Sequence, residues 1–596
     1  MTIRAITGLA LLNLSFAAAG AALLWGLRGW RRWWDVARLG GVAYLLGLAG
    51  TVVLLTLALT AGVPFSGWTV VAAPAVLLAG GVALALRRGH ARPQLKPRIA
   101  RLTVPAALGL AALGVYFEAL FRSARLMPLS EWDAWWCWTL RAKAIFYFHG
   151  LDQGLFGAEA PRCPGYPPGF SAVEAAGFHA MGSVDVVTLH VQYWFLALGF
   201  VGALAGLLAP RVRQSILLPF LVLVLLLPSF TSRVTDGRAD LPLDYLVAVG
   251  ALLVLLWLEA GRAWHLPVAT VLFGAALLTK REGLLLVVCV LAAALVASWP
   301  ERRRAWPPLL AVGGVAVVLA LPWRLWLMLE GRRSGAPEGG YLEVLEHPGR
   351  VPASLRLVAR TLFDYDLWLL LAPLALVAAL LALVAGQVRV AVYTAVFVAT
   401  SVAACTWAIS AEPALEITQD YGLNPVVRLV GGPVLTLAAL TPLVLERAWA
   451  GMRAEPAAGA GEASSGGAPA RRRTAISRAI VLVAVLGYPL SALAGYSGLR
   501  LPGGLPDFPA AEECVQAPVP GGQVRLVLGY VDSYRAADDL EERGREAGVG
   551  DAVTGHDGCG RLRVFVPGVP ASAARALVAR AAAAGLHPTL ERDPAS

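Results

Sequence analysis

Residues 40–62 read GGVAYLLGLAGTVVLLTLALTAG, a run without a single charged side chain. About 20 apolar residues are enough for a helix to cross the hydrocarbon core of a membrane. Similar runs recur along the 596 residues of the chain, which is 58% hydrophobic but only 15% charged. Soluble domains are typically about 45–50% apolar and 25% charged. The sequence therefore predicts an all-α polytopic membrane protein.

We expect about fourteen transmembrane helices, using roughly 20 residues per crossing. The expected spans are residues 5–27, 40–62, 69–86, 100–121, 189–208, 215–231, 241–260, 265–279, 284–299, 307–329, 365–386, 390–409, 427–445 and 479–497. The first run is too long for the apolar part of a typical signal peptide, so we interpret it as a retained span. Spans 265–279 and 284–299 are short, and the charged turn between them should lie recessed and face a cavity.

Basic residues sort to one side of this path, after spans one, three, five and nine and before the last. They include Arg28, Arg87, Arg211, Arg302 and Arg471. Positively charged loops mark the cytoplasmic side, which predicts an inner (plasma) membrane protein of bacterial type with both termini extracytoplasmic. The net charge of +11 is explained in this way, so we expect contact with membrane lipids and no nucleic-acid partner.

The expected organisation has five parts. They are N-terminal transmembrane helices (1–99), a membrane core (100–445) with a large external loop (122–188), a flexible Ala/Gly/Ser-rich cytoplasmic linker (446–478), the last span (479–497), and an external domain (505–596). In that small α+β domain, strands near 524–528, 551–554, 561–566 and 586–591 and helices near 536–547 and 572–584 give the order βαββαβ.

The external loop contains the segment SEWDAWWCWTLRAKAIF, residues 130–146. Glu131 and Asp133 stand among four tryptophans and are followed by Arg141 and Lys143. Tryptophans at the end of a span are ordinarily an aromatic belt. The added charges favour a site that holds a polar molecule at the membrane surface.

Three further charged clusters fall on the same external face. They are Asp236, Arg238, Asp240 and Asp244; Lys280, Arg281 and Glu282; and Arg428. Each has a structural alternative, because charges at helix entries are often caps or snorkelling residues. Their shared face favours one site, in which a carboxylate could take a proton and fixed cations could stabilise a departing phosphate.

The chain has three lysines, Lys96, Lys143 and Lys280, and two of them lie in these external clusters. An ammonium group suits a point-charge phosphate ligand. A divalent cation, Mg or Mn, is possible on the carboxylates, but no histidine spacing of a metal site and no glycine-rich phosphate loop occurs.

The order of these motifs, with Tyr166-Pro-Pro between the first and second clusters, resembles polytopic glycosyltransferases of the GT-C superfamily, related to aminoarabinose and mannosyl transferases. The resemblance covers roughly residues 100–445. It implies a polyprenyl-phosphate sugar donor, an envelope glycan, lipid or protein acceptor, and inverting transfer on the outer face. The small external domain loosely resembles SPOR-like peptidoglycan-binding modules, with glycan binding and a packing or lid role both open.

The resemblance also implies roles for residues. The catalytic base would be Asp133, with Glu131 as the fallback, and the second acidic site Asp240 or Asp236. The substrate-binding candidates are Lys143, Arg141, Trp135, Trp136, Tyr166, Asp236, Arg238, Lys280, Glu282 and Arg428.

Four cysteines fall in the predicted external segments. Cys137 and Cys163 lie in the large loop, and Cys514 and Cys559 in the small domain. An oxidising exterior would permit two disulfides. Two other functions stay open: a transporter or flippase of a lipid-linked or polar solute, and a non-catalytic envelope assembly protein.

Overall fold

A computed structural model of the chain describes most of the molecule. The described residues are 3–30, 32–92, 104–127, 129, 131, 133–151, 153–156, 163, 165–329, 343–411, 424–453, 523–531, 534–556 and 562–591. The expected last span (479–497), most of the expected linker, Trp132, Cys514 and Cys559 lie outside them.

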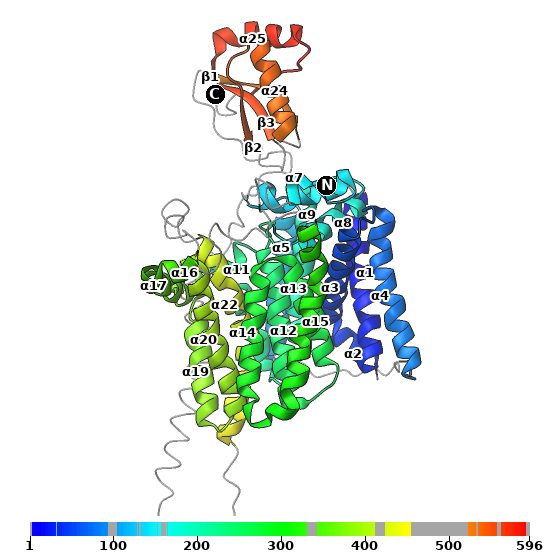
Figure 1. The fold of residues 1–596 in the computed structure, drawn as a ribbon, viewed down its shortest axis with the longest axis vertical. Helices are drawn as coiled ribbons and strands as arrows, with labels where there is room; N and C mark the ends of the chain where they lie inside the picture. The colour runs from blue at the N-terminus through cyan, green and yellow to red at the C-terminus, as the bar shows by residue number, and fades with distance from the viewer. Residues whose placement is uncertain are drawn as a thin grey trace, which may run out of the picture.

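The described chain is mostly helical, and nine of its helices are long and apolar enough to cross a membrane. They are α1 (Ile3–Arg28), α3 (Gly40–Thr60), α4 (Gly67–Arg87), α5 (Val104–Ala124), α9 (Val186–Leu208), α12 (Asp240–Ala260), α15 (Arg302–Leu329), α20 (Val388–Ala411) and α22 (Asn424–Arg453). All nine coincide with expected spans. The coarse expectation of a helical, membrane-type fold is confirmed (Figure 1).

Four other expected spans are shorter apolar helices. They are α10 (Gln214–Leu225), α13 (His265–Thr279), α14 (Glu282–Ala297) and α19 (Leu371–Val384). The shortness of α13 and α14 was expected. The expected continuous spans 215–231 and 365–386 are wrong. The first is interrupted, because a second helix, α11 (Pro228–Thr231), begins at Pro228. The second is interrupted, because α18 (Tyr365–Trp368) ends at Leu369, which has a φ of +54°. The full count of fourteen stays a prediction.

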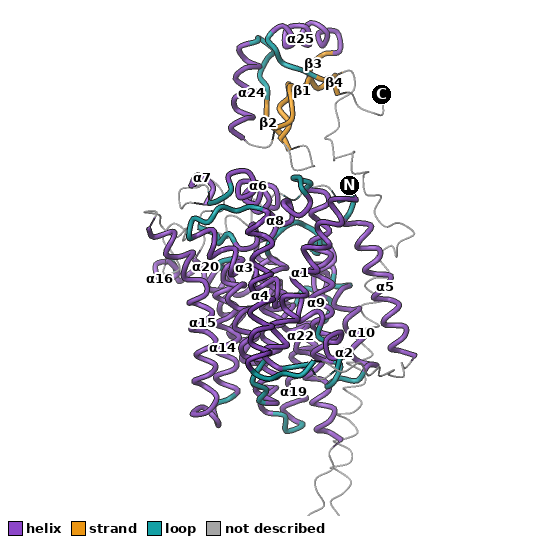
Figure 2. Tube along the Cα trace, turned by 90° about the vertical axis from the view of Figure 1, so that its right-hand side faces the viewer, coloured by secondary structure: helices purple, strands orange, loops and turns teal. Residues whose placement is uncertain are grey.

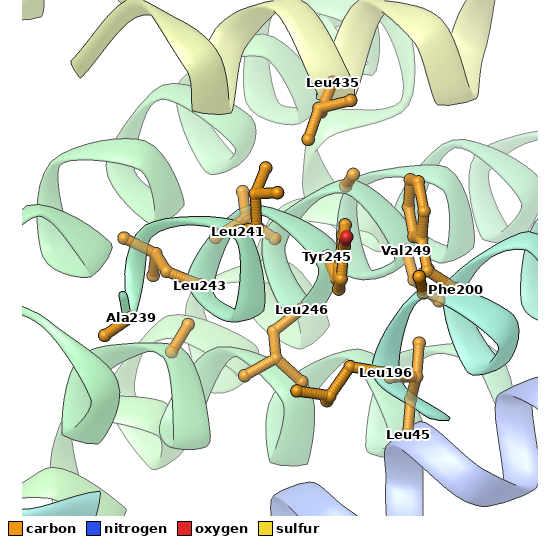
Figure 3. Packing of buried hydrophobic residues seen from close by; sticks show 14 of the residues in the cluster. Leu45, Leu196, Phe200, Ala239, Leu241, Leu243, Tyr245, Leu246, Val249 and Leu435 are labelled. Carbon is orange, nitrogen blue, oxygen red and sulfur yellow. The ribbon is translucent and has the colours of Figure 1, made fainter. Parts of the chain in front are cut away.

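Helix α12 forms the centre of the bundle. It packs against α13, α22, α14 and α9, and 94% of its most apolar window is buried. Figure 3 shows its side chains between Leu435 of α22 on one side and Leu196 and Phe200 of α9 on the other. A helix that is apolar on every face fits such a buried position. Residues at the two ends of α12 are therefore fixed in place by the rest of the bundle.

Short elements connect the long helices. They are α2 (Trp33–Arg38), the π-helix η1 (Ala134–Trp138), α6 (Thr139–Phe148), α7 (Gln153–Phe156), α8 (Gly169–Met181), η2 (Trp299–Glu301), α16 (Glu343–Glu346), η3 (Pro348–Arg350) and α17 (Val351–Leu362). Figure 2 shows α6, α7 and α8 together at one end of the bundle. The helix expected after Tyr166-Pro-Pro is α8.

One domain boundary is corrected. The linker was expected to begin at residue 446, but α22 continues to Arg453. Contacts with neighbouring helices hold this extension: Arg213 Nε lies 2.9 Å from Glu446 Oε1, and Arg447 Nε donates to Glu259 over 2.7 Å.

The C-terminal domain has the expected βαββαβ order. Its elements are β1 (Gln523–Val531), α24 (Tyr534–Glu546), β2 (Val553–His556), β3 (Leu562–Pro570), α25 (Ala571–Ala583) and β4 (Thr589–Glu591). The four strands form an antiparallel sheet in the order β2-β3-β1-β4. Runs of consecutive buried residues, 524–528 of β1 and 562–564 of β3, supply the domain's core.

Candidate functional site

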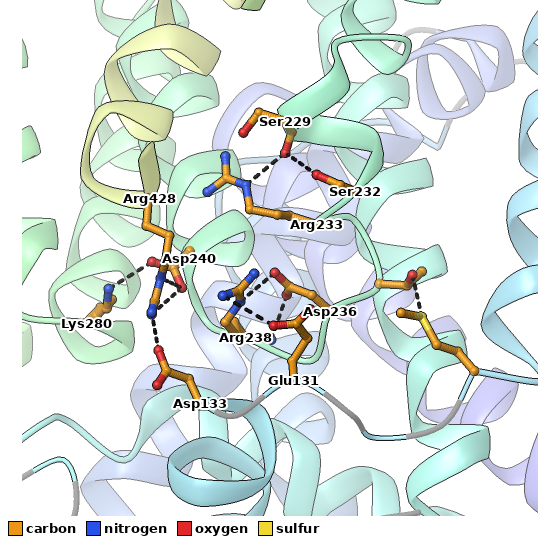
Figure 4. Close-up of polar contacts among 12 residues, drawn as sticks. Glu131, Asp133, Ser229, Ser232, Arg233, Asp236, Arg238, Asp240, Lys280 and Arg428 are labelled. Atoms are coloured by element: carbon orange, nitrogen blue, oxygen red, sulfur yellow. Dashed lines mark hydrogen bonds and ion pairs between the residues drawn. The ribbon is translucent and has the colours of Figure 1, made fainter. Parts of the chain in front are cut away.

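A chain of ion pairs links three of the predicted charged clusters to Arg428. Asp240, the first residue of α12, accepts from Lys280 Nζ at 2.9 Å and from Arg428 Nη2 at 3.0 Å. Arg428 also pairs with Asp133, and Lys280 Nζ lies 3.0 Å from Glu282. Figure 4 shows Asp133, Arg428, Asp240 and Lys280 converging from separate elements. The structure thus brings together residues separated by almost 300 positions in the sequence.

A second branch joins Glu131 to the turn before α12. Arg238 Nε donates to Asp236 over 2.6 Å, and the Arg238 backbone N–H donates to the same carboxylate over 2.9 Å. Glu131 lies 3.6 Å from the Arg238 guanidinium. Burial raises the pKa of the Asp236 carboxyl, although Arg238 opposes this effect. Glu131 therefore contacts Arg238 in the turn after α11, and Asp133 contacts Arg428 near the start of α22.

A glycine allows this turn to pack against the tryptophan segment. Gly237 has a φ of +77°, a conformation that residues with a side chain rarely adopt. A Cβ atom at this position would lie 2.9 Å from the Cβ of Ala134, the first residue of η1. The close approach of these two backbones places Asp133 and Asp236 in the same site.

The tryptophan segment forms η1, and π-helical turns occur frequently at functional sites. A disulfide joins Cys137 of η1 to Cys163, as the two cysteines of the large loop led us to expect. The rings of Trp135 and Trp136 are in T-shaped contact at 5.8 Å. These two side chains, with Lys143 buried in α6, lie on the segment that carries Asp133.

Tyr166 connects the large loop to the turn between α13 and α14. Its hydroxyl donates to Glu282 over 3.3 Å, and the Arg281 guanidinium lies 4.3 Å from its ring centre. Arg141 donates to the Tyr166 carbonyl and lies 4.2 Å from the ring of Phe156. Arg141 is therefore a buried residue that holds the loop in position.

Exposure separates the carboxylates into two groups. The side chains of Asp236 and Asp240 are only 3% and 5% exposed, whereas those of Asp133 and Glu131 are 31% and 41% exposed. Burial lowers the pKa of Lys280, but Asp240 and Glu282 outweigh it and raise that pKa above its ordinary value. The buried members are thus a fixed charged frame, and Asp133 and Glu131 are more exposed than Glu282, whose side chain is 25% exposed.

Arg233, a buried arginine beside the site, belonged to none of the predicted clusters, and Asp244 of the second cluster was not among the predicted site residues. Arg233 donates from Nε to the Ser229 carbonyl over 2.8 Å and stacks on Trp368, with 5.6 Å to the ring centre. A Cβ at Gly431 would contact both Arg233 and Asp244, so these two groups lie close together against the same face of α22. The charge of Arg233 in an expected external turn was the available signal.

Glu174 of α8 is a second buried acid that the predicted site did not include. It is fully buried, accepts a hydrogen bond of 2.7 Å from the Tyr193 hydroxyl, and has its pKa raised by burial to about 8.

No three histidine, cysteine, aspartate or glutamate side chains form a metal-binding group within the described ranges. Asp133, Asp236, Asp240 and Glu282 are each paired with arginine or lysine. A site for Mg or Mn stays a prediction.

The whole chain was compared with protein-family models, with curated proteins and with solved structures, and no match was found in any of the three.

Proposed function

We propose that this protein is a multi-pass inner-membrane glycosyltransferase that moves a sugar from a polyprenyl-phosphate donor to a cell-envelope acceptor on the outer face. One observation carries the proposal: Asp133, Arg428, Asp240 and Lys280 form a continuous ion-pair chain at one end of an apolar bundle. The GT-C resemblance of the four motifs supports the same assignment.

The proposed reaction needs two kinds of group. The acceptor hydroxyl needs a base within hydrogen-bond reach, and Asp133 is a partly exposed carboxylate at the rim of the site. The departing polyprenyl phosphate needs fixed positive charge, which Arg428 and Lys280 supply. Donor binding in this proposal places the phosphate against Arg428, which frees Asp133 from its ion pair to accept the proton.

The lipid tail of such a donor needs an apolar surface beside the phosphate site. Val358 and Leu362 of α17, Phe397 of α20, and Val430 of α22 line a small apolar cleft. Val430 lies two residues after Arg428 on α22, and side chains two residues apart in a helix point to different sides. The cleft is therefore on another side of α22 from Arg428, and the proposal does not depend on it.

The test is a transfer assay on the purified, reconstituted protein with a panel of polyprenyl-phosphate sugars. We expect release of polyprenyl phosphate, and a loss of at least about 100-fold in Asp133→Asn, within the range of general-base contributions. Glu118→Gln is the matched control, because Glu118 is an exposed carboxylate paired with Arg122 on α5.

Wild-type transfer by Asp133→Asn would refute the base assignment. Movement of intact lipid-linked sugar across the vesicle membrane, without cleavage, would replace the transferase with a flippase.

A further inference from the structure

A cavity of about 650 Å³ lies at the opposite end of the bundle from the candidate site. It opens among the ends of α12, α14, α20 and α22, with Glu259 contributed by α12. Asp240 and Glu259 stand 19 residues apart on α12, which separates them by about 30 Å along the axis. That distance equals the hydrocarbon thickness of a membrane. In the membrane-embedded bundle proposed above, the cavity therefore lies at the second interface.

The lining of this cavity is amphiphilic. Val296, Ala297, Val390 and Val392 form an apolar wall, and Arg389 and Arg447 supply guanidinium groups. An apolar wall beside cationic groups matches a molecule with both a hydrocarbon part and a negatively charged part.

Neighbouring acids hold both arginines in place. Arg447 donates to Glu259 from Nε over 2.7 Å and from Nη2 over 3.1 Å. Arg389 donates from Nη1 to the Leu258 carbonyl over 2.6 Å and pairs through Nη2 with Glu301. A guanidinium has five N–H donors, so each arginine has donors beyond these described contacts.

The surroundings are positive and suit an interface. Arg302, Arg303 and Arg304 follow η2 directly in the sequence but do not line the cavity, whose lining arginines are Arg389 and Arg447. Trp299 lines the cavity and is 56% exposed. Exposed tryptophan is typical of the headgroup level of a membrane. Basic pockets between transmembrane helices are known sites for anionic lipid headgroups.

We propose that this cavity binds the headgroup of an anionic phospholipid, with the phosphate on Arg389 and Arg447 and the acyl chains along the valine wall. The site is distinct from the proposed transferase site, because no residue lining it belongs to the ion-pair chain around Asp240.

Binding is tested by native mass spectrometry and thermal unfolding of the purified full-length protein in detergent. The additions are phosphatidylglycerol, phosphatidylcholine or inorganic phosphate. We expect phosphatidylglycerol to bind and raise the Tm, with Arg389→Gln weakening binding by about tenfold through the loss of one charge-assisted contact. Arg303→Gln, an equal charge change on an exposed neighbour, should bind like the wild type.

Arg389→Lys keeps the positive charge and shows whether a loss in Arg389→Gln comes from the missing charge or from misfolding. It should retain more binding than Arg389→Gln, and the unliganded Tm of each variant reports its fold. Three results would overturn the proposal: equal binding of phosphatidylcholine, the full effect with inorganic phosphate alone, or equal losses in Arg303→Gln and Arg389→Gln.

Discussion

At the scale of single residues, Asp240 is the central residue of the candidate site. Its carboxylate pairs with Lys280 Nζ at 2.9 Å and with Arg428 Nη2 at 3.0 Å, and its side chain is 5% exposed. A buried carboxylate between two cations is strongly favoured in its ionised form, and so is a poor proton acceptor. Its role is to fix the positions of the two cations, which leaves proton transfer to the more exposed Asp133.

Replacing Asp240 with asparagine should destabilise the fold. Lys280 and Arg428 would then face each other without their shared counter-charge, at a cost of about 3–5 kcal/mol in the free energy of unfolding. Unfolding of the purified variant in detergent measures the loss of stability. Glu118→Gln, which removes one partner of an exposed ion pair, should have little effect on stability.

A double-mutant cycle with Lys280→Met distinguishes this explanation from a general packing defect. The two changes should be less than additive, because each removes one partner of the same pair. Strictly additive losses would contradict a direct interaction between Asp240 and Lys280.

Glu174 predicts a dependence of stability on pH. Its pKa of about 8 in the folded protein lies above the ordinary value of 4.5, because the carboxyl is buried. Between these two values the folded state holds a proton that the unfolded state has lost. Stability should therefore fall as the pH rises from about 5 to 8, by up to about 1.4 kcal/mol per pH unit.

Glu174→Gln keeps a neutral side chain at this position and should remove that slope. The measurement is the Tm of both proteins in detergent across this pH range. Parallel curves for the two proteins would show that Glu174 is ionised in the folded state.

At the scale of elements, the sequence predicted where helices and strands lie better than it predicted their local backbone geometry. The helix entry at Asp240, the short pair α13 and α14, and the order of the C-terminal domain all followed from apolar periodicity and turn residues. The π-helical form of residues 134–138 was not predicted, and neither was the close packing of Gly237 against Ala134 at its start. Such a contact between distant segments leaves no periodic signal.

Gly237→Ala should separate the two halves of the site. The left-handed backbone costs a residue with a Cβ about 1–2 kcal/mol, and the new Cβ would lie within 2.9 Å of the Cβ of Ala134. The matched control is Gly261→Ala, because Gly261 has a φ of +61° and nothing within 4 Å of the added Cβ.

Both variants should therefore lose some stability, but only Gly237→Ala should also lose transfer activity through displacement of Asp133. The comparison of Tm and transfer rate decides this. Equal activity in the two variants would show that the contact with η1 does not position the site.

At the scale of the whole molecule, topology explains which part of the site could be predicted. Charge counting along the expected spans placed Asp133, Asp236, Lys280 and Arg428 on one face, and the ion-pair chain joins these clusters. The pairing partners could not be predicted, because they depend on how α12, α13 and α22 pack. Arg233 was missed for the same reason: its significance comes from its position beside Asp244 against one face of α22.

The proposed orientation makes a prediction about labelling of intact cells. Ser183, in the turn between α8 and α9, is exposed near the candidate-site end, and Arg303 is exposed at the cavity end. The chain has four cysteines besides the Cys137–Cys163 pair, and all four are first replaced by serine. A single new cysteine is then introduced at residue 183 or 303.

A membrane-impermeant thiol reagent should label Ser183→Cys in intact bacterial cells, because positively charged loops stay in the cytoplasm and the candidate site faces outward. Arg303→Cys should react only after the membrane is permeabilised. Permeabilised cells serve as the control for reactivity at both positions. The reverse pattern would place the ion-pair chain in the cytoplasm, where a transfer to the cell envelope could not occur, and the proposed function would fail with it.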